Sequence, residues 1–535
     1  FLKKLEYSDE SPIYNIGEKW RLISHSDTWV YLAKYISRED LEKFKTICIK
    51  ILSEEHPKYK LEADKRYMAS FYNATPKYSY EIKKGVSETL IILSVFGKKF
   101  GLTALDNPKV FVDQIVNSIL NEASEELYRS LGYNLMLLAE AAPEVFLNQI
   151  QAIIDDKRVM TFFEEEGGIM GSSNDLPFLL WSLESIAWIP ELLTKTSSIL
   201  CQLIELAPKK LPTSNTPYNT LKSIFKTWHP QTNATFEERK QVLNVIAQKY
   251  PAVGFQLLNS LIFRRNDHAM PTHKMQWRLF EDTRAVSITN LEVFETENFA
   301  VDKMLEIINI SNDINQILSL IAKFDSLRKN NIDKFLDCLK RLDSSKIEDS
   351  SKIYHAFRDV IGRHRTHSSQ NWAIPENILS ETQKIAELFK PDDLILANEY
   401  LFGNSPIPIE GNDSKLNFED RAKELNNKRK EFVEKIISQH SIEKVIEFAN
   451  KLETPGFVGH ALAGIVLSKE DENKLYGLLK SDKKENISLI QSYIYSKDFK
   501  LGQEKTLEIF NKLLNDGSFS NQSLAKFFLA IRFDV

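Results

Sequence analysis

The sequence predicts an all-helical protein, and its composition and apolar pattern support this. The 535 residues include only 18 Gly and 18 Pro, fewer than the turns of a β-rich chain of this length need. Hydrophobic residues make up 43% and charged residues 27%, the balance of a folded protein and not of a disordered one. Apolar residues recur at helical spacing from end to end, whereas the strict alternation typical of strands is missing. We therefore expect little sheet.

Several predicted helices carry recognisable ends. Ser37 and Asp40 form a capping signal, and Thr235 and Glu238 form a second one. In such a capping box each side chain accepts the backbone N–H at the other position. An apolar stripe at helical spacing follows both signals, and Gly517 follows a third stripe at the place of a C-cap glycine.

A weak internal repeat predicts how the helices are arranged. The pattern A-x-x-x-P-x-V occurs at 139–145 and at 247–253, and each copy is predicted to end one helix and begin the next. A poorer copy lies at 206–208, and its proline precedes Pro251 by 43 residues, close to the ~40–47 of HEAT-like helix pairs. Each pair leaves an apolar face that the next pair covers. We expect an irregular α-solenoid of stacked helix pairs, a HEAT/TPR-like superhelix.

The chain is too long for one core, since single cores stop growing near roughly 250–300 residues. Gly, Pro and polar stretches between the helical patterns suggest where it divides. The predicted parts are an N-terminal helical-repeat region at 1–262, an irregular basic loop at 263–285, a middle helical-repeat region at 286–402, a linker at 403–415 and a C-terminal helical subdomain at 416–535.

Charge, cysteines and apolar runs predict the compartment. The net charge is −5, so no global basic field attracts nucleic acid. Cys48, Cys201 and Cys338 are odd in number and far apart, which favours a reducing compartment. The longest apolar run, 90–96, is far shorter than the ~20 residues that cross a bilayer. We expect a cytoplasmic protein without membrane contact; because the chain begins with Phe1, we also expect it to be a piece of a longer polypeptide.

One glycine-rich stretch resembles a phosphate-binding loop. Gly167-Gly168-x-x-Gly171 follows Glu164, Glu165 and Glu166, and no lysine comes after it. Phosphate loops need backbone N–H groups together with a lysine at a helix start, and three carboxylates would repel phosphate. An ordinary loop between helices is the simpler interpretation.

Two close histidine pairs were considered as metal ligands. His268 and His273 are five residues apart across a proline, whereas helical metal pairs lie four apart on one face. His364 and His367 are surrounded by arginines that disfavour a cation. No nucleophile-elbow or Cys–His signature is present either. We therefore expect no catalytic residue, no metal site and no cofactor.

The basic loop is the first candidate for a binding site. It combines cationic side chains with a tryptophan, a mixture that suits phosphate or carboxylate groups. The alternative, which we favour, is that the arginines pair with nearby acids such as Glu281 and Asp282. The second candidate is the short Arg/His-rich segment near residue 364. The candidate binding residues are Arg264, Arg265, His268, His273, Lys274, Trp277 and Arg278, together with Arg363 and Arg365.

Four short segments carry a resemblance to a known class of proteins. They are Leu138-Ala-Glu-Ala-Ala-Pro143, Leu180-Trp-Ser-Leu-Glu184, Trp228-His-Pro-Gln-Thr232 and Gly362-Arg-His-Arg365. Together they resemble the helical-repeat C-terminal region of large bacterial STAND-type NTPases and other anti-phage defence proteins. The resemblance implies a sensor or assembly region that follows a nucleotide-binding or effector module. It supplies no catalytic residues, and any NTPase or effector activity would lie outside this segment.

These observations predict a non-catalytic recognition or scaffold region. Its partners would be proteins, either phage-derived or a second copy of the chain, with an attached effector or NTPase module. The alternative is a helical-repeat protein that binds nucleic acid through its Arg/His-rich loops, with an affinity that falls steeply with salt. A third hypothesis, an enzyme with an unfamiliar site, needs a polar cleft with convergent acid–base groups.

Overall fold

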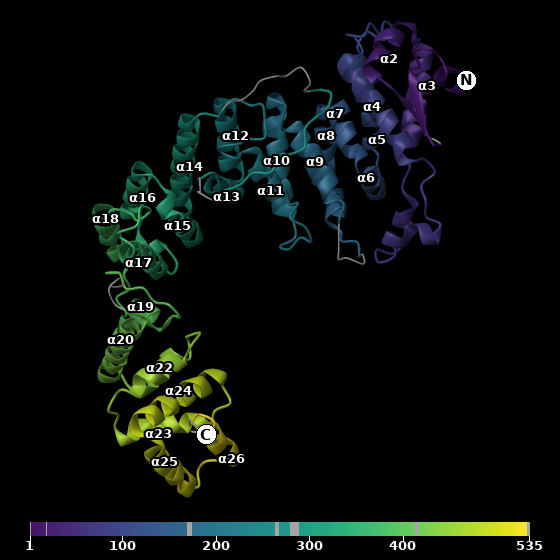
Figure 1. Cartoon of the computed structure of the whole chain (residues 1–535). Coiled ribbons are helices and arrows are strands. Elements are labelled where there is room, and N and C mark those ends of the chain that lie inside the picture. The colour runs from purple at the N-terminus through teal and green to yellow at the C-terminus, as the bar shows by residue number, and fades with distance from the viewer. Residues whose placement is uncertain are drawn as a thin grey trace. The chain divides into compact units, whose positions relative to one another are not determined.

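The computed structural model describes residues 2–17, 19–167, 174–262, 267–278, 288–411 and 417–531. The regular secondary structure of these residues is helical apart from one two-stranded sheet, so the predicted all-α fold class is confirmed (Figure 1). The chain divides into two compact units, Phe1–Ile307 and Ile308–Val535, with the boundary inside helix α14 (Asn290–Ser311). The five predicted regions are a finer division and remain a prediction.

The first unit contains the sheet, several short 3-10 helices and the α-helices from α1 to α13. The strands β1 (Ile13–Ile16) and β2 (Lys19–Leu22) are antiparallel, and Ile16 pairs with Lys19 across a turn in which Gly17 has a φ of +63°. The helices are α1 (Leu2–Glu6), α2 (His25–Leu32), η1 (Ala33–Tyr35), α3 (Arg38–Leu52), η2 (Pro57–Lys60), η3 (Arg66–Tyr72), α4 (Tyr80–Phe96), α5 (Pro108–Leu120), α6 (Glu125–Leu131), α7 (Asn134–Ala141), α8 (Pro143–Asp155), η4 (Arg158–Phe163), α9 (Leu176–Ile186), α10 (Pro190–Leu206), α11 (Pro217–Ile224), α12 (Phe236–Lys249) and α13 (Pro251–Leu261).

Most helices of the first unit pack in two rows. The first row consists of α4, α7, α9, α11 and α13, and each of these helices contacts the next. The second row consists of α3, α5, α8, α10 and α12, which contact one another in the same order. Contacts such as α4 with α5, α7 with α8 and α12 with α13 join the rows. The first unit is therefore a two-layered array of helices (Figure 1).

Proline at the first helical position explains how the chain changes rows so quickly. The predicted junctions at Pro143 and Pro251 are confirmed, since α8 and α13 begin there after one residue that caps both helices. This costs no hydrogen bond, because the first N–H of a helix has no partner inside it. The third predicted copy is wrong: no helix begins at Pro208, and the next one begins at Pro217, because polar and turn residues separate the two.

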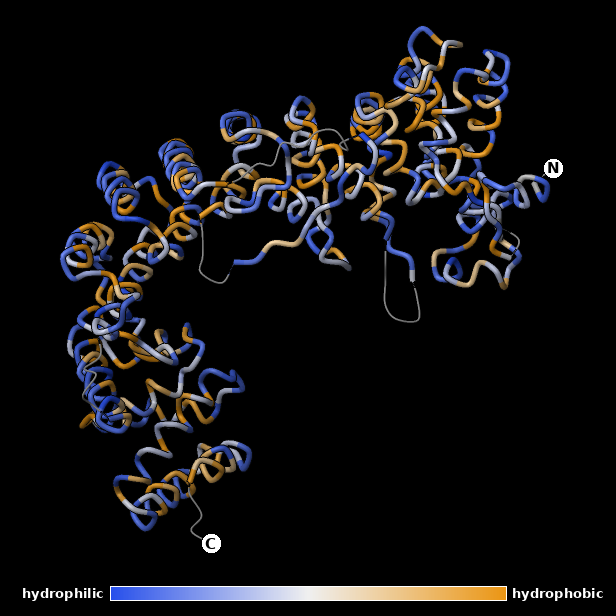
Figure 2. Tube along the Cα trace, turned by 45° about the horizontal axis from the view of Figure 1, so that its top comes forward, coloured by the Kyte–Doolittle hydropathy of each residue, from blue (hydrophilic) through white to orange (hydrophobic). Residues whose placement is uncertain are grey.

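Most helices contribute one apolar stripe to the core. In α5 the stripe is Phe111, Val112, Ile115, Val116 and Ile119, all at most 6% exposed. Burying an aliphatic or aromatic side chain of this size stabilises a fold by roughly 1.5–3 kcal/mol. Hydrophobic and hydrophilic residues are interspersed along the helices (Figure 2). The capping boxes expected at Ser37 and Thr235 begin α3 and α12 and are confirmed.

The second unit continues with helices of mixed length. They are α15 (Ile314–Ile321), η5 (Phe324–Ser326), α16 (Lys329–Arg341), η6 (Ser344–Lys346), α17 (Ser351–Thr366), α18 (Glu376–Ala386), η7 (Glu387–Phe389), α19 (Leu394–Asn398), η8 (Glu399–Phe402), α20 (Phe418–Gln439), α21 (Ile442–Ala449), α22 (Gly456–Leu462), α23 (Lys469–Gly477), η9 (Leu478–Lys480), α24 (Lys484–Leu501), α25 (Gln503–Asp516) and α26 (Asn521–Phe528). Gly517 caps α25 with a φ of +66°, as predicted.

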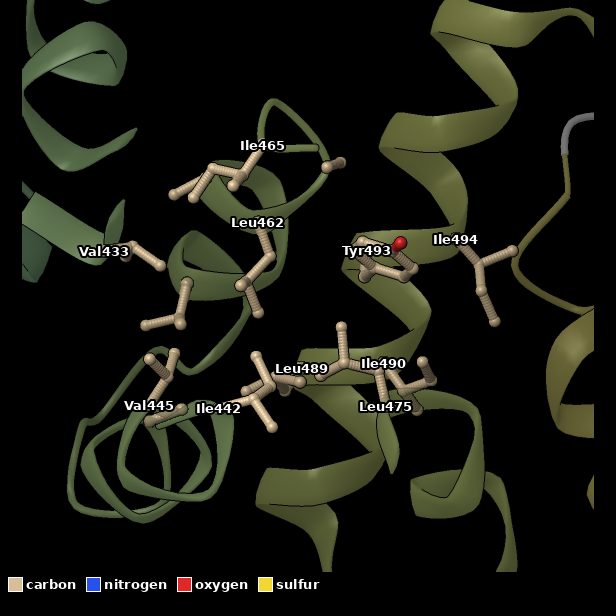
Figure 3. Close-up of a cluster of buried hydrophobic side chains, with 14 of the residues drawn as sticks. Val433, Ile442, Val445, Leu462, Ile465, Leu475, Leu489, Ile490, Tyr493 and Ile494 are labelled. Carbon is tan, nitrogen blue, oxygen red and sulfur yellow. The ribbon is translucent and has the colours of Figure 1, made fainter. Parts of the chain in front are cut away.

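The core of residues 401–531 centres on α22 and α24. Leu462 of α22 points toward Leu489 and Tyr493 of α24 (Figure 3). The two helices approach closely at Gly459, because a Cβ there would collide with the carbonyl oxygen of Leu489 and lie 2.8 Å from the Tyr493 nitrogen. Glycine is therefore required for this helix contact.

Membrane insertion of a helix is not supported by the described residues. None of the helices that the structure places is both long enough and apolar enough to span a bilayer.

Candidate functional site

The described part of the predicted basic loop is an extended segment that runs back along the first row of helices. We call residues 267–278 the crossing segment. At one end Asp267 pairs with Lys226, just past α11, at 2.5 Å. At the other end Arg278 donates to the hydroxyl of Ser94 on α4 at 3.1 Å. The segment thus joins helices that are far apart in the sequence (Figure 1).

Glu140 holds the far end of the crossing segment. Its carboxylate accepts the backbone N–H groups of Gln276, Trp277 and Arg278 at 3.1, 2.5 and 2.8 Å. Glu140 is only 4% exposed, so this charge is held almost entirely inside the protein. Hydrogen bonds to an ionised carboxylate are about twice as strong as neutral ones. Glu140 is therefore the main anchor of this end.

The Arg278 side chain binds the end of α7. Its Nε donates to the carbonyl oxygen of Glu140 at 2.9 Å, and one Nη donates to that of Ala141 at 3.0 Å. Burial lowers the pKa of Arg278 from its ordinary value, and the negative charge of Glu140 opposes this shift. The guanidinium satisfies carbonyl groups that have no partner within the helix.

The middle of the crossing segment rests on α9 and on the residues that follow it. The backbone N–H of His273 donates to Glu184 at 3.1 Å, and its ring nitrogen Nδ1 lies 2.9 Å from the same carboxylate. The ring also packs against Trp181, with centroids 4.7 Å apart. The Lys274 ammonium lies 3.7 Å from the ring centroid of Trp188, a cation–π contact.

Thr272 provides one more connection along the row. Its backbone N–H donates to Oε1 of Gln231 at 3.2 Å, and its hydroxyl accepts the indole N–H of Trp188 at 3.2 Å. Gln231 belongs to the turn between α11 and α12 and is 2% exposed. The crossing segment therefore links α4, α7 and α9, three consecutive helices of the row, with the turn that follows α11.

The contacts explain why this segment is basic. Ser94, Glu140, Glu184 and Lys226 lie in or just after the last turns of α4, α7, α9 and α11. The C-terminal ends of helices carry partial negative charge and unpaired carbonyl groups. The cationic side chain of Arg278 donates to two such carbonyl groups at the end of α7, whereas at α11 the segment places an acidic residue, Asp267, against Lys226. The positive charges of His273, when protonated, and Arg278 are thus directed at the protein's own groups.

The other candidate residues of the basic loop differ in placement. Arg264 and Arg265 lie outside the described residues, as do Glu281 and Asp282 of the alternative interpretation. His268 is exposed. The Trp277 ring meets His25 of α2 edge to face at 6.4 Å. The structure therefore brings His273, Lys274, Trp277 and Arg278 together on the row of helices.

Arg363 and Arg365 lie at the end of α17, in the second unit. Arg363 is exposed and reaches Asp325 at 3.6 Å. Arg365 donates to Glu376 at 2.6 Å and to the carbonyl oxygen of Ile409 at 2.9 Å. The second contact holds the described part of the predicted linker, 403–411, on α17.

The anchors of the crossing segment were not among the predicted site residues. Glu140, Glu184 and Gln231 each belong to one of the short segments that carry the family resemblance, at 138–143, 180–184 and 228–232. The structure shows that these three segments meet at the crossing segment. Glu140 and Glu184 could have been identified from the sequence as polar residues inside otherwise apolar helix ends, where a buried polar group needs a partner.

A buried ionic cluster in the first unit was also missed. Arg129, 4% exposed, donates to Glu164, Glu166 and Asp175 at 2.6–2.7 Å. Tyr59 also donates to Asp175, at 3.1 Å. Two of the three acidic residues that precede the glycine-rich stretch, Glu164 and Glu166, thus bind Arg129. Residues 168–173 of that stretch lie outside the described residues.

The cysteines of the described residues are buried packing residues, and the histidines and cysteines there form no metal site. Among the residues that the structure places, no three or more His, Cys, Asp or Glu side chains form a group that could hold a metal ion. His364 is fully buried and its Nδ1 accepts the N–H of Ile374 at 3.1 Å. Burial raises the pKa of Cys48 and of Cys201 to about 12, which keeps both thiols protonated and unreactive.

Comparison with known proteins adds no further assignment, because no family model, curated protein or solved structure matches the chain.

Proposed function

We propose that this chain is a non-catalytic recognition and scaffold region, an irregular α-solenoid that binds a protein partner. The two rows of the first unit support the solenoid, since each helix covers the apolar face of the one before it. The crossing segment supports it as well, because it fastens successive helices into one continuous surface.

One observation carries the proposal of a protein partner. None of the eight residues of α2 is buried. Tyr31 is 70% exposed and Leu32 52%, and Tyr35 in the following turn is 74% exposed. Elsewhere in the first unit a third exposed ring, Phe71 in η3, is 84% exposed. Aromatic and aliphatic side chains gathered in the open are typical of surfaces that another protein covers.

The resemblance to STAND-type and other anti-phage defence proteins supports a role as the sensor or assembly part of such a protein. In that role the partner is a phage-derived protein or a second copy of this chain. Its binding shifts the state of an attached effector or NTPase module, because a ligand favours the state to which it binds more tightly.

Photo-crosslinking in living cells tests the proposal directly. A photoreactive phenylalanine analogue replaces Tyr31 in the full chain. The matched control carries it at Ile310, which is 85% exposed on α14. We expect a discrete crosslinked protein from position 31 and none from position 310, and peptide mass spectrometry then shows whether it is a second copy. Equal crosslinking from both positions, or none from position 31, contradicts the proposal.

The nucleic-acid alternative remains a prediction. His273 and Arg278, two of its candidate residues, contact acidic and carbonyl groups of the chain itself.

A further inference from the structure

A groove in the second unit has an unusual charge distribution. It lies between α20, α22 and α24 and has a volume of about 620 Å³. Three cationic side chains line it, Arg429, Lys430 and Lys500, together with His460. None of the described residues that line it is acidic, although the whole chain has a net charge of −5. The groove therefore concentrates positive charge.

Arg429 also lines this groove and is only 5% exposed. Its Nε donates to the carbonyl oxygen of Leu401 at 2.7 Å and an Nη donates to that of Gly403 at 3.1 Å. The guanidinium lies 3.9 Å from the ring centroid of Phe457. These contacts fix its position but do not neutralise its charge.

Other buried arginines of the chain have acidic partners. Arg129 binds three carboxylates, and Arg358 binds Asp359 at 2.6 Å. No carboxylate of the described residues forms an ion pair with Arg429, and burial lowers its pKa to about 10. It still carries its proton at neutral pH. A buried cation without a counter-charge is costly, so an anion from solution stabilises it.

The side chains of two lysines approach Gly464 in the groove. Gly464, just past the end of α22, leaves space there, because a Cβ on it would lie 3.2 Å from the Lys500 ammonium and 3.3 Å from Cδ of Lys430. The Lys500 ammonium is held by the carbonyl oxygen of Ala463 at 3.4 Å, and only Lys430 has an acidic neighbour, Glu434, at 3.6 Å. An exposed pair of that kind contributes little and is easily replaced.

Aromatic rings accompany the positive charge. Tyr495 is 46% exposed and Phe499 is 68% exposed, and both line the groove one turn apart on α24. Their spacing of four residues places them on the same face of the helix, next to Lys500. Exposed rings beside cations are the combination that stacks nucleobases and binds phosphates. The volume is within the range of small-molecule sites.

We propose that this groove binds a nucleotide, with its phosphates between Lys430 and Lys500 above Arg429 and its base on Tyr495 and Phe499. This site belongs to the second unit and α2 to the first, so the proposal stands independently of the proposed protein partner.

Calorimetric titration of the full chain tests the site. The probes are ADP, GDP, CDP and UDP, with adenosine and inorganic pyrophosphate as the separate halves of the first. We expect at least one nucleoside diphosphate to bind with a micromolar dissociation constant, and each half to bind at least about tenfold more weakly. Tetraglutamate serves as an anion without a base, and its binding as tightly as the best nucleotide would overturn the proposal.

Variants locate the binding in the groove. Lys500→Glu and Phe499→Ala each change an exposed side chain, and we expect each to weaken the best nucleotide about tenfold or more. Lys484→Glu is the matched control, because Lys484 is exposed on the same helix but lies outside the groove. The proposal is overturned by unchanged affinity in Lys500→Glu, by equal losses in all three variants, or by no binding of any nucleotide at about 1 mM.

Discussion

Replacing Gly459 by Ala tests the packing of the second unit. A Cβ at this position would collide with the carbonyl oxygen of Leu489 and lie 2.8 Å from the Tyr493 nitrogen and 3.0 Å from Cβ of Ser492. Carbon atoms pack at about 3.5–4.0 Å, so α22 must move away from α24 by roughly half an ångström or more. The movement loosens the buried side chains drawn in Figure 3.

The expected magnitude is the difference between two opposing terms. Overpacking a well-filled contact costs about 1–3 kcal/mol. Alanine in place of a helical glycine regains about 0.5–1 kcal/mol through its better helix propensity. The steric cost is larger, so Gly459→Ala should destabilise the second unit by about 1–2 kcal/mol. This lowers its melting temperature by several degrees, since a unit of this size shifts by about 2–4 °C per kcal/mol.

Differential scanning calorimetry of the full chain measures this shift. Gly477→Ala is the matched control, because it lies in the same unit and a Cβ there meets no atom within 4 Å. The control should be unchanged or slightly stabilised. Hydrogen exchange in α24 should be faster in Gly459→Ala and unchanged in Gly477→Ala. A melting temperature of Gly459→Ala equal to or above that of the wild type refutes the packing argument.

Two further predictions concern the buried anchor of the first unit and the buried histidine of the second. Glu140→Gln removes the charge that accepts three backbone N–H groups, so the amides of 276–278 should exchange about tenfold faster or more, a loss of about 1.5 kcal/mol. The control is Glu144→Gln, which changes a largely exposed neighbour and should leave these exchange rates unchanged. Equal exchange rates in the two variants would show that the Glu140 charge is not the anchor. Burial lowers the pKa of His364 below 6.5 in the folded state, and the charge of Arg363 lowers it further. At pH below 6.5, His364 therefore takes up a proton in the unfolded chain that it does not take up in the folded chain. The urea midpoint should therefore fall as the pH drops from about 7.5 to about 5.5 and fall less in His364→Gln, and an identical pH dependence of that variant would remove His364 as a cause.

The sequence by itself determined the class of the fold and many helix ends. Capping boxes at Ser37 and Thr235, prolines at 143 and 251 and the glycine at 517 act within a few residues, so their effect does not depend on distant parts of the chain. The hairpin at 13–22 was not predicted, because each strand has only four residues, too few for a recognisable alternation.

The tertiary structure alone decided the partners of the charged residues. The basic residues of 267–278 were identified from sequence, but their acceptors Glu140 and Glu184 lie 138 and 89 residues away along the chain. Likewise, no local pattern shows that Arg429 lacks a carboxylate partner among the described residues while Arg129 has three. Capping depends on neighbours in sequence, whereas charge pairing depends on which helices the packing of apolar stripes brings together. That packing is the physical reason why the helices could be predicted and the sites required the structure.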